Sequence, residues 1–175
     1  MKVRAVFPGT FDPIHNGHIN IALRATRIFD EVIIAVYDRP LKNLLFSPDE
    51  RLKLVSDSFR DIPGIKVTGY SGMTVEFCRK IKAQVIVRGL RVFSDFEAEF
   101  RMALANHRLA PDIEVVALIT DEEHTFFSSS TVREIVSLGG NVSSMVPGHV
   151  KKALLKKFKE TYGTDNVYPV QSLRD

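Results

Sequence analysis

Short apolar runs alternate with amphipathic stretches along this chain. Five of the runs are rich in β-branched residues and bounded by turn residues, a combination that predicts strands. They lie at residues 3–7, 32–36, 65–69, 84–87 and 114–118. Because they are mostly apolar without strict alternation, they are typical of strands buried on both faces of a sheet.

The stretches between the runs have helical spacing. Apolar residues three and four positions apart, from Ile19 through Ile28 and Phe29, predict a helix that begins near Gly17. The segment 47–50, Ser-Pro-Asp-Glu, is a capping box with proline at the first helical position, and it predicts a helix to about residue 59. Further helices are expected at 74–82, from a cap at Ser94 to 109, at 130–138 before two glycines, and at 147–161.

Strands that alternate with helices favour a parallel sheet covered on both faces. We therefore predict the α/β class: a single-domain, Rossmann-like, doubly wound parallel five-stranded sheet with helices on both faces. A chain of 175 residues is long enough for one such core. The domain is expected to span residues 1–162, followed by a polar C-terminal tail at 163–175. Ligands bind such sheets at the carboxyl ends of the strands.

Composition narrows the class of protein. The net charge is only +3, and no interleaving of aromatic and basic residues predicts a nucleic-acid partner. No run approaches the ~20 apolar residues of a membrane helix, and the apolar N-terminal run is too short for a signal peptide. Cys78 is the only cysteine, which excludes an intrachain disulfide and a cysteine-rich metal site and fits a cytoplasmic location.

The loop after the first strand, residues 9–18, has the sequence Gly-Thr-Phe-Asp-Pro-Ile-His-Asn-Gly-His. Its first glycine permits a tight turn, and Thr10 offers a hydroxyl. A helix that begins near Gly17 directs free N–H groups toward the same crevice, which suits an anion. His15 and His18 lie three positions apart there, where both can donate to phosphate oxygens. Two histidines without a carboxylate fall short of a zinc site.

Two other segments fit an anion as well. Arg88 and Arg91 follow the predicted strand end at Val87, and arginine binds phosphate with two parallel hydrogen bonds. The serines at 128–130 precede a helix, where at least one is expected to act as a cap while their amides and hydroxyls form a second phosphate cradle. Taken alone, Lys42 would be a solvated surface charge.

Four blocks in one order resemble the phosphopantetheine adenylyltransferase family of the nucleotidyltransferase superfamily: residues 9–18, Lys42, 88–91 with 95–97, and 127–130. The resemblance covers roughly residues 1–160. It implies adenylyl transfer from ATP to 4′-phosphopantetheine, giving dephospho-coenzyme A and pyrophosphate in coenzyme A biosynthesis. A phosphate acceptor is already nucleophilic, so we expect direct in-line attack without a covalent enzyme intermediate.

The resemblance also implies partners and residue roles. Magnesium would be bound mainly through ATP phosphates without a protein metal site, the assembly would be a homohexamer, and coenzyme A would be a possible feedback ligand. His18 would stabilise the transition state, with Lys42 and Arg91 as further catalytic residues. The acceptor would be bound by Thr10, Lys42, Thr74 and Arg88. ATP would be bound by Thr10, Phe11, His18, Gly89, Leu90, Arg91, Glu99, His124, Thr125, Phe126, Phe127, Ser128, Ser129 and Ser130.

The chain departs from the family pattern near the predicted nucleotide rim. Ala98 stands where the family commonly has an aromatic residue, and His124 where it often has tryptophan. Met73 and Thr74 replace a common Leu-Met pair, so the role of Thr74 depends on its position more than on its side chain.

Three other functions compete with adenylyl transfer to phosphopantetheine. A related nucleotidyltransferase could use nicotinate mononucleotide or glycerol 3-phosphate as acceptor, although Lys42 and the 88–91 block argue against it. A tRNA synthetase is excluded by length and by the lack of a Lys-Met-Ser-Lys-Ser-like loop. A non-catalytic nucleotide-binding regulator is disfavoured because His18, Lys42 and both arginines are present.

Overall fold

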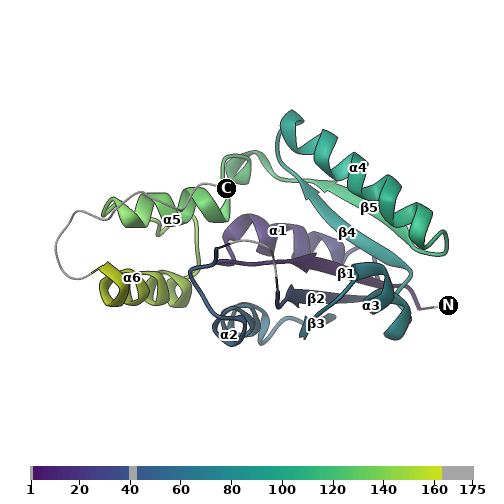
Figure 1. Ribbon diagram of the computed structural model, residues 1–175, viewed down its shortest axis with the longest axis horizontal. Helices are drawn as coiled ribbons and strands as arrows, with labels where there is room; N and C mark the ends of the chain where they lie inside the picture. The colour runs from purple at the N-terminus through teal and green to yellow at the C-terminus, as the bar shows by residue number, and fades with distance from the viewer. Residues whose placement is uncertain (1, 40–42, 163–175) are drawn as a thin grey trace.

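The computed structural model describes residues 2–39 and 43–162, so Lys42 and the predicted tail lie outside the described residues. All five predicted strands form one parallel sheet in the order β3-β2-β1-β4-β5 (Figure 1). The strands are β1 (Arg4–Gly9), β2 (Glu31–Tyr37), β3 (Ile65–Tyr70), β4 (Val85–Leu90) and β5 (Glu114–Ile119). The predicted fold class is therefore confirmed.

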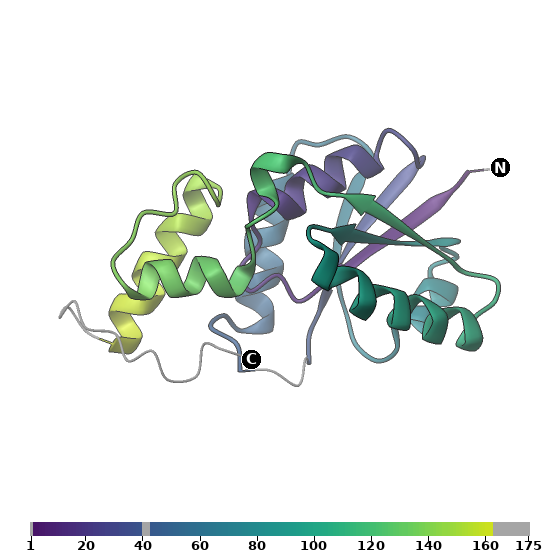
Figure 2. The ribbon, with the colours of Figure 1, turned by 90° about the horizontal axis from the view of Figure 1, so that it is seen from above.

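The helices and the single 3₁₀ turn assigned in the described ranges follow the predicted alternation. They are α1 (Asn16–Ala25), α2 (Pro48–Phe59), α3 (Thr74–Lys80), α4 (Phe93–Leu109), η1 (Glu122–His124), α5 (Ser129–Ser137) and α6 (Gly148–Tyr162). Figures 1 and 2 both show α5 and α6 next to each other beyond one end of the strands, which is the carboxyl end. This pair therefore lies on the side of the sheet where ligands bind in such folds.

The core has two parts, one on each face of the sheet. On one face, Phe7, Ile34 and Val36 pack with Ile21 of α1 and Val55 of α2, and the cluster continues into α5 and α6. On the other face, the smaller cluster consists of Val6, Ile33, Ala35, Val75, Cys78, Ala83, Ile86, Ala110 and Ile113. Neighbouring residues of β1 and β2 point into opposite clusters, which explains why residues 5–7 and 32–36 are apolar without alternation.

Several predicted boundaries differ from those of the structure. β4 does not end at Val87, because β5 continues beside it and pairs Arg88 with Ala117 and Leu90 with Ile119. α1 ends at Ala25 and not at Phe29. The chain there turns toward β2, which leaves Phe29 buried and Ile28 exposed.

The predicted serine cap of α4 is also wrong. The helix already begins at Phe93, with Val92 at the N-cap position and no side-chain cap. Asp95 instead reaches back and accepts a hydrogen bond from the Arg91 amide at 3.3 Å. The capping box of α2 is confirmed, since Ser47 Oγ accepts from the Glu50 amide and a Glu50 carboxylate oxygen accepts from the Ser47 amide.

One buried arginine joins the segments that surround the future site. Arg51 of α2 is fully buried and donates to backbone carbonyls of Thr10 at 2.7 Å and Tyr37 at 2.6 Å. It also donates to the carbonyls of Asp38 at 3.2 Å and Phe46 at 3.3 Å. The same guanidinium therefore fixes the loop after β1, the end of β2 and the chain just before α2.

We predict that Arg51→Met lowers the free energy of unfolding by about 3 kcal/mol or more, because buried carbonyls lose their donor. Urea unfolding followed by circular dichroism measures this loss. Arg60→Met is the control, since Arg60 is exposed and pairs with Asp57 at the surface; it should change stability by less than about 0.5 kcal/mol. Equal losses in the two variants would contradict a special role for Arg51.

Candidate active site

A cavity of about 380 Å³ opens at the carboxyl ends of β1 and β4. These two central strands are neighbours in the sheet, and the order of the chain reverses between them. Such a switch point is where open parallel sheets bind ligands. The lining includes ten residues that the sequence predicts for substrate binding, namely Thr10, Phe11, His18, Arg88, Gly89, Arg91, Glu99, Ser128, Ser129 and Ser130.

Other predicted residues lie elsewhere. Thr74 begins α3, and its hydroxyl is 3.0 Å from that of Tyr70. The lining does not include Thr74, Leu90 or the segment 124–127. Lys42 lies outside the described residues, but Asn43, directly after it, lines the cavity.

The loop after β1 has a compact turn. Phe11 has φ of 52°, in the left-handed region, which costs about 1–2 kcal/mol for a residue with a side chain. Its buried ring contacts His18 edge-on, with 5.0 Å between ring centroids. A Cβ on Gly9 would lie 2.8 Å from this ring, so only glycine fits there without displacement. The turn therefore places the Phe11 ring against one side of the His18 imidazole.

Asp12 connects this turn to two other segments. Its carboxylate is buried and accepts from the amides of Leu45 at 2.8 Å and Phe46 at 2.9 Å. It also accepts from Nη1 of the buried Arg133 of α5 at 3.2 Å. A buried carboxylate needs such partners, and here they fix the loop before α2 and helix α5 around the cavity.

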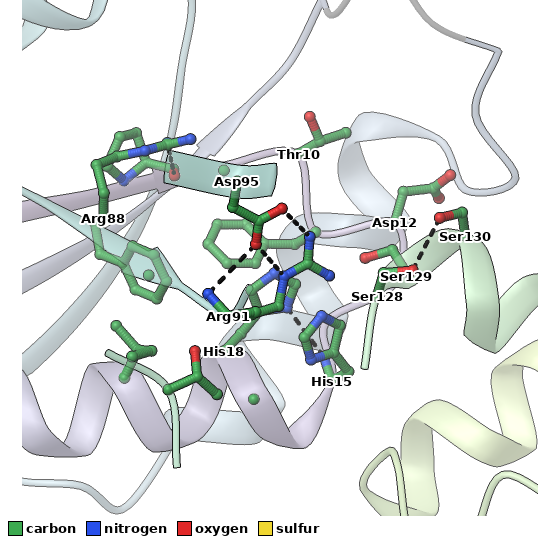
Figure 3. Close-up of a pocket in the computed structure, with 18 of the residues that line it drawn as sticks. Thr10, Asp12, His15, His18, Arg88, Arg91, Asp95, Ser128, Ser129 and Ser130 are labelled. Carbon is green, nitrogen blue, oxygen red and sulfur yellow. Dashed lines mark hydrogen bonds and ion pairs between the residues drawn. The ribbon is translucent and has the colours of Figure 1, made fainter. Parts of the chain in front are cut away.

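The two histidines form a stacked pair, with ring centroids 3.7 Å apart (Figure 3). The backbone N–H of His15 donates to Nδ1 of His18 at 3.2 Å. This hydrogen bond makes Nδ1 an acceptor, so a neutral His18 carries its proton on Nε2. A Cβ on Gly17 would lie 3.0 Å from the His15 ring, and the glycine between the histidines thus leaves room for the stack.

Both rings are neutral at pH 7 in the free protein. Burial, followed by the charges of Arg91 and Arg88, lowers the pKa of His18 to about 3. Burial, followed by His18 and then Arg91, holds the pKa of His15 well below its ordinary value. His18 is therefore a neutral hydrogen-bond donor at neutral pH, and not a cation.

Among the described residues, the charged side chains that line the cavity are paired one to one. Three lining arginines each meet one lining carboxylate, in the pairs Arg88–Glu99, Arg91–Asp95 and Arg133–Asp12. Figure 3 shows the Arg91–Asp95 bridge above the stacked histidines. Anion binding here thus depends on directed N–H groups that the carboxylates leave free.

The start of α5 supplies such groups. Ser128 is the N-cap, and its Oγ accepts from the Thr131 amide at 3.0 Å, which confirms the expected cap. Ser129 Oγ donates to the Pro13 carbonyl at 2.8 Å and so joins α5 to the first loop. The amides of Ser129 and Ser130 lie in the first turn, where no carbonyl of the helix can accept from them. They form a site suited to phosphate.

Within the described ranges, no three or more His, Cys, Asp or Glu side chains gather in a group that could hold a metal ion. The three carboxylates that line the cavity are each bound to an arginine. Among the described helices, none combines the length and the apolar character needed to cross a membrane.

Sequence reasoning assigned no role to three lining residues, Asp12, Asp95 and Arg133. Helical spacing could have revealed two of them. Asp95 lies four positions after Arg91, and Arg133 lies three after Ser130, on the same side of α5. Asp12 carries no comparable signal, because its partners are 33 to 121 positions away in sequence.

A profile of the Cytidylyltransferase-like family matches residues 6–135. Phosphopantetheine adenylyltransferase from Roseiflexus castenholzii is 57% identical over 159 residues, covering 91% of this chain and 97% of that protein. The protein of the same name from Moorella thermoacetica is 51% identical, covering 90% of this chain and 98% of its own. The chain belongs to the phosphopantetheine adenylyltransferase family. The resemblance drawn from the four sequence blocks is thereby confirmed.

Solved structures agree at the level of fold. A putative nicotinate-nucleotide adenylyltransferase from Vibrio parahaemolyticus superimposes with a TM-score of 0.68 at 21% identity, covering 89% of this chain and 99% of that one. A lipopolysaccharide core biosynthesis protein from Thermoplasma volcanium gives 0.53 at 20% identity, covering 70% of this chain and 100% of that one. The fold of this chain thus also occurs in proteins that carry other names.

We predict that His18 of this family member stays neutral, with its proton on Nε2, from pH 8 down to pH 5. Its pKa of about 3 lies below the ordinary value of 6.5, so the unfolded chain takes up a proton in this range and the folded protein does not. His18 therefore lowers stability progressively as pH falls from about 6.5 toward 3. Histidine ¹⁵N NMR shifts, assigned by comparison with His18→Gln, measure both the protonation state and the tautomer of the ring. An imidazolium signal for His18 at pH 6 would contradict the prediction.

Proposed function

We propose that this chain transfers the adenylyl group of ATP to 4′-phosphopantetheine. An oxygen of the acceptor phosphate attacks the α-phosphorus, the bond from that phosphorus to the bridging oxygen breaks, and pyrophosphate leaves with the electron pair. Dephospho-coenzyme A is the second product. The observation that most supports this proposal is a single cavity lined by His18, Arg88, Arg91 and the start of α5. The chain is also 57% identical to a protein named phosphopantetheine adenylyltransferase.

The geometry gives each group a role in this proposal. The amides of Ser129 and Ser130 with Arg91 would hold the β- and γ-phosphates of ATP, while Arg88 and Thr10 would hold the acceptor phosphate. Nε2–H of His18 would donate to a nonbridging oxygen of the α-phosphate as negative charge develops there. The reaction brings two anions together, so the contribution of the protein is positioning and charge stabilisation.

The remaining predicted contacts belong to the same proposal. Lys42 would bind phosphates of both substrates, and Leu90 with the segment 124–127 would border the nucleotide. Thr74 would serve the acceptor. A second cavity of about 230 Å³, lined partly by Tyr70 and Ser71, offers space near Thr74 for the pantetheine arm.

Magnesium fits the site only through the substrate. The cavity carboxylates of Asp12, Asp95 and Glu99 are bound to arginines, so they do not form a set of oxygen ligands for a divalent cation. We therefore propose that Mg²⁺ is coordinated mainly by ATP phosphates and water, and that no protein side chain forms a metal cage.

We also propose a homohexamer, with coenzyme A as a possible feedback ligand. Helix α4 supports a protein contact because it exposes large apolar side chains: Phe96, Phe100, Met102, Leu104 and Leu109. Such a group on one helix is typical of an interaction surface.

The acceptor is tested first by pyrophosphate release with ATP and Mg²⁺. We expect release with 4′-phosphopantetheine and, with nicotinate mononucleotide, at least about 100-fold less, since a site built for one polar substrate leaves groups unpaired with another. Release with the nicotinate compound alone would keep the chemistry but reject the proposed acceptor. No release with either would reject the enzyme.

His18→Ala should lower turnover by roughly 10²–10³-fold, the scale for loss of one preorganised donor, while substrate affinity changes much less. His18→Gln keeps a neutral N–H near the same place and should lose less than His18→Ala. Steady-state pyrophosphate release and calorimetric ATP binding measure the two quantities. Near-normal turnover of His18→Ala would remove this residue from the mechanism.

A further inference from the structure

Asn16 lies between His15 and Gly17, and contact with a substrate does not explain its role. His15, Gly17 and His18 line the cavity, whereas Asn16 does not. Asn16 is the first residue of α1, and its side chain donates to the loop between α5 and α6, residues 138–147. The residue between the two histidines is therefore bound to another part of the protein.

Two consecutive carbonyls of this loop accept hydrogen bonds from Asn16. Its Nδ2 donates to the Ser144 carbonyl at 2.8 Å, and its backbone N–H donates to the Met145 carbonyl, also at 2.8 Å. The first amides of a helix have no acceptor within the helix, so the Met145 carbonyl supplies one from outside. The carbonyl of the same peptide group, that of His15, accepts from the His18 amide at 2.9 Å. The peptide between His15 and Asn16 is thus held from both sides.

The accepting loop is itself fixed by burial. Val142, Met145 and Val146 are buried and belong to the core cluster that includes residues of α5 and α6. The Met145 amide also donates to the Val142 carbonyl at 2.9 Å, which closes a tight turn. Because a close-packed core resists displacement, the carbonyls of Ser144 and Met145 are firm attachment points for the start of α1.

The first loop has a second attachment to the same pair of helices. Ser129 of α5 donates to the Pro13 carbonyl at 2.8 Å, three positions before Asn16. Residues 13–16 are therefore held to α5 at one end and to the α5–α6 loop at the other. This arrangement fixes the start of α1, which carries His18, relative to the first amides of α5. In the proposed reaction these two groups act on one triphosphate, so their relative position affects the rate.

We propose that Asn16 is a positioning residue, which acts on the reaction through His18. Its hydrogen bonds to the α5–α6 loop hold the peptide between His15 and Asn16, and the neighbouring His15 amide donates to Nδ1 of His18 at 3.2 Å. Loss of the Asn16 side-chain bond lets this amide move, so that it no longer fixes the tautomer and direction of the imidazole. The effect on turnover rests on the proposed function, whereas the effect on the ring concerns the free protein alone.

The first test is the tautomer of His18 without substrate. Asn16→Ala removes the Nδ2 donor and keeps the backbone hydrogen bond. In the wild type we expect ¹⁵N NMR shifts of one tautomer, with Nδ1 of His18 as an acceptor. In Asn16→Ala we expect shifts between those of the two tautomers, because the His15 amide no longer selects one. Wild-type His18 shifts in this variant would overturn the proposal, whatever its activity.

The second test compares turnover with substrate affinity. A misplacement of about 1 Å can lower a rate roughly 10²-fold, and a smaller displacement is expected here, so kcat of Asn16→Ala should fall about 10-fold. KM for ATP and for phosphopantetheine should change less than about threefold, because the lost interaction belongs to the transition state. Steady-state pyrophosphate release measures these constants. A rise in KM with unchanged kcat would assign Asn16 to substrate binding and reject a positioning role.

Asn16→Asp separates the attachment to the loop from the stability of the helix. The carboxylate has nearly the same size and cannot donate to the Ser144 carbonyl, but a negative charge is favourable at a helix N-terminus. We expect kcat to fall at least as far as in Asn16→Ala without a matching loss in melting temperature. If turnover instead follows melting temperature across the two variants, the role of Asn16 is merely structural and the proposal is wrong.

Thr26→Ala is the matched control at the opposite end of α1. It removes one side-chain hydrogen bond, from Thr26 Oγ1 to the Leu23 carbonyl at 2.7 Å. The control should leave kcat, KM and the His18 shifts unchanged. Equal changes in Thr26→Ala and Asn16→Ala would show that any loosening of α1 has this effect, and would also reject a special role for Asn16.

A double-mutant cycle tests whether Asn16 acts through His18. In a His18→Ala background, Asn16→Ala should change kcat by less than about twofold, because the group that it positions is gone. The same loss in both backgrounds would mean that Asn16 acts by another route. If the wild-type chain releases no pyrophosphate, the proposed function fails, and the NMR comparison still decides the placement of the ring. If the chain is active and the shifts or the cycle disagree, this inference alone fails.

Discussion

The buried carboxylate of Asp12 joins three segments that form the cavity. It lies in the loop after β1, accepts from two amides before α2 and from Arg133 of α5, and is 2% exposed. Because a buried charge without partners is strongly destabilising, these segments are stable only in this arrangement. Arg51 is the opposite case, a buried cation held by backbone carbonyls of neighbouring segments. Side-chain charges bonded to backbone groups thus hold the loops that the sheet alone does not position.

The consequence for binding is a cavity whose described side-chain charges are matched before any ligand arrives. The arginines have carboxylate partners, and the two histidines are neutral. Affinity for phosphates then depends on free N–H groups in fixed directions: the remaining arginine donors and the first amides of α5. Preorganised donors of this kind need no reorganisation when charge moves from one oxygen to another during transfer.

The sheet could be predicted from the sequence because its signals are local. Apolar runs with turn residues at both ends located all five strands, and Ser47 with Glu50 located the start of α2. The predicted boundaries are wrong where a residue distant in sequence determines the end of an element. β4 continues through Arg88 because β5 pairs with it, and α4 begins without a serine cap because Asp95 binds Arg91.

The residues of the candidate site also fall into those that local sequence signals predict and those that only distant contacts reveal. Ten predicted residues line the cavity because the segments that carry them meet at one edge of the sheet: the loop after β1, the end of β4, and helices α1, α4 and α5. The roles of Asp12 and Arg51 depend on hydrogen bonds across 5 to 121 positions, which no spacing rule detects. The sequence does contain one signal for Arg51, because helical spacing places it on the same face of α2 as the apolar residues Leu54 and Val55. A charged residue on the apolar face of a helix predicts a buried polar contact, but it does not predict which groups the residue contacts.

A neutral His18 is better suited to this transfer than a protonated one. An imidazolium would bind the triphosphate strongly before reaction, and binding that is equal in the ground and transition states does not raise turnover. A neutral Nε2–H forms a hydrogen bond that strengthens as charge develops on the α-phosphate. Burial, followed by the charges of Arg91 and Arg88, lowers the pKa of His18 and so disfavours its charged form, while the His15 amide fixes the tautomer. The packing of the first loop therefore sets the chemistry of the side chain that it carries.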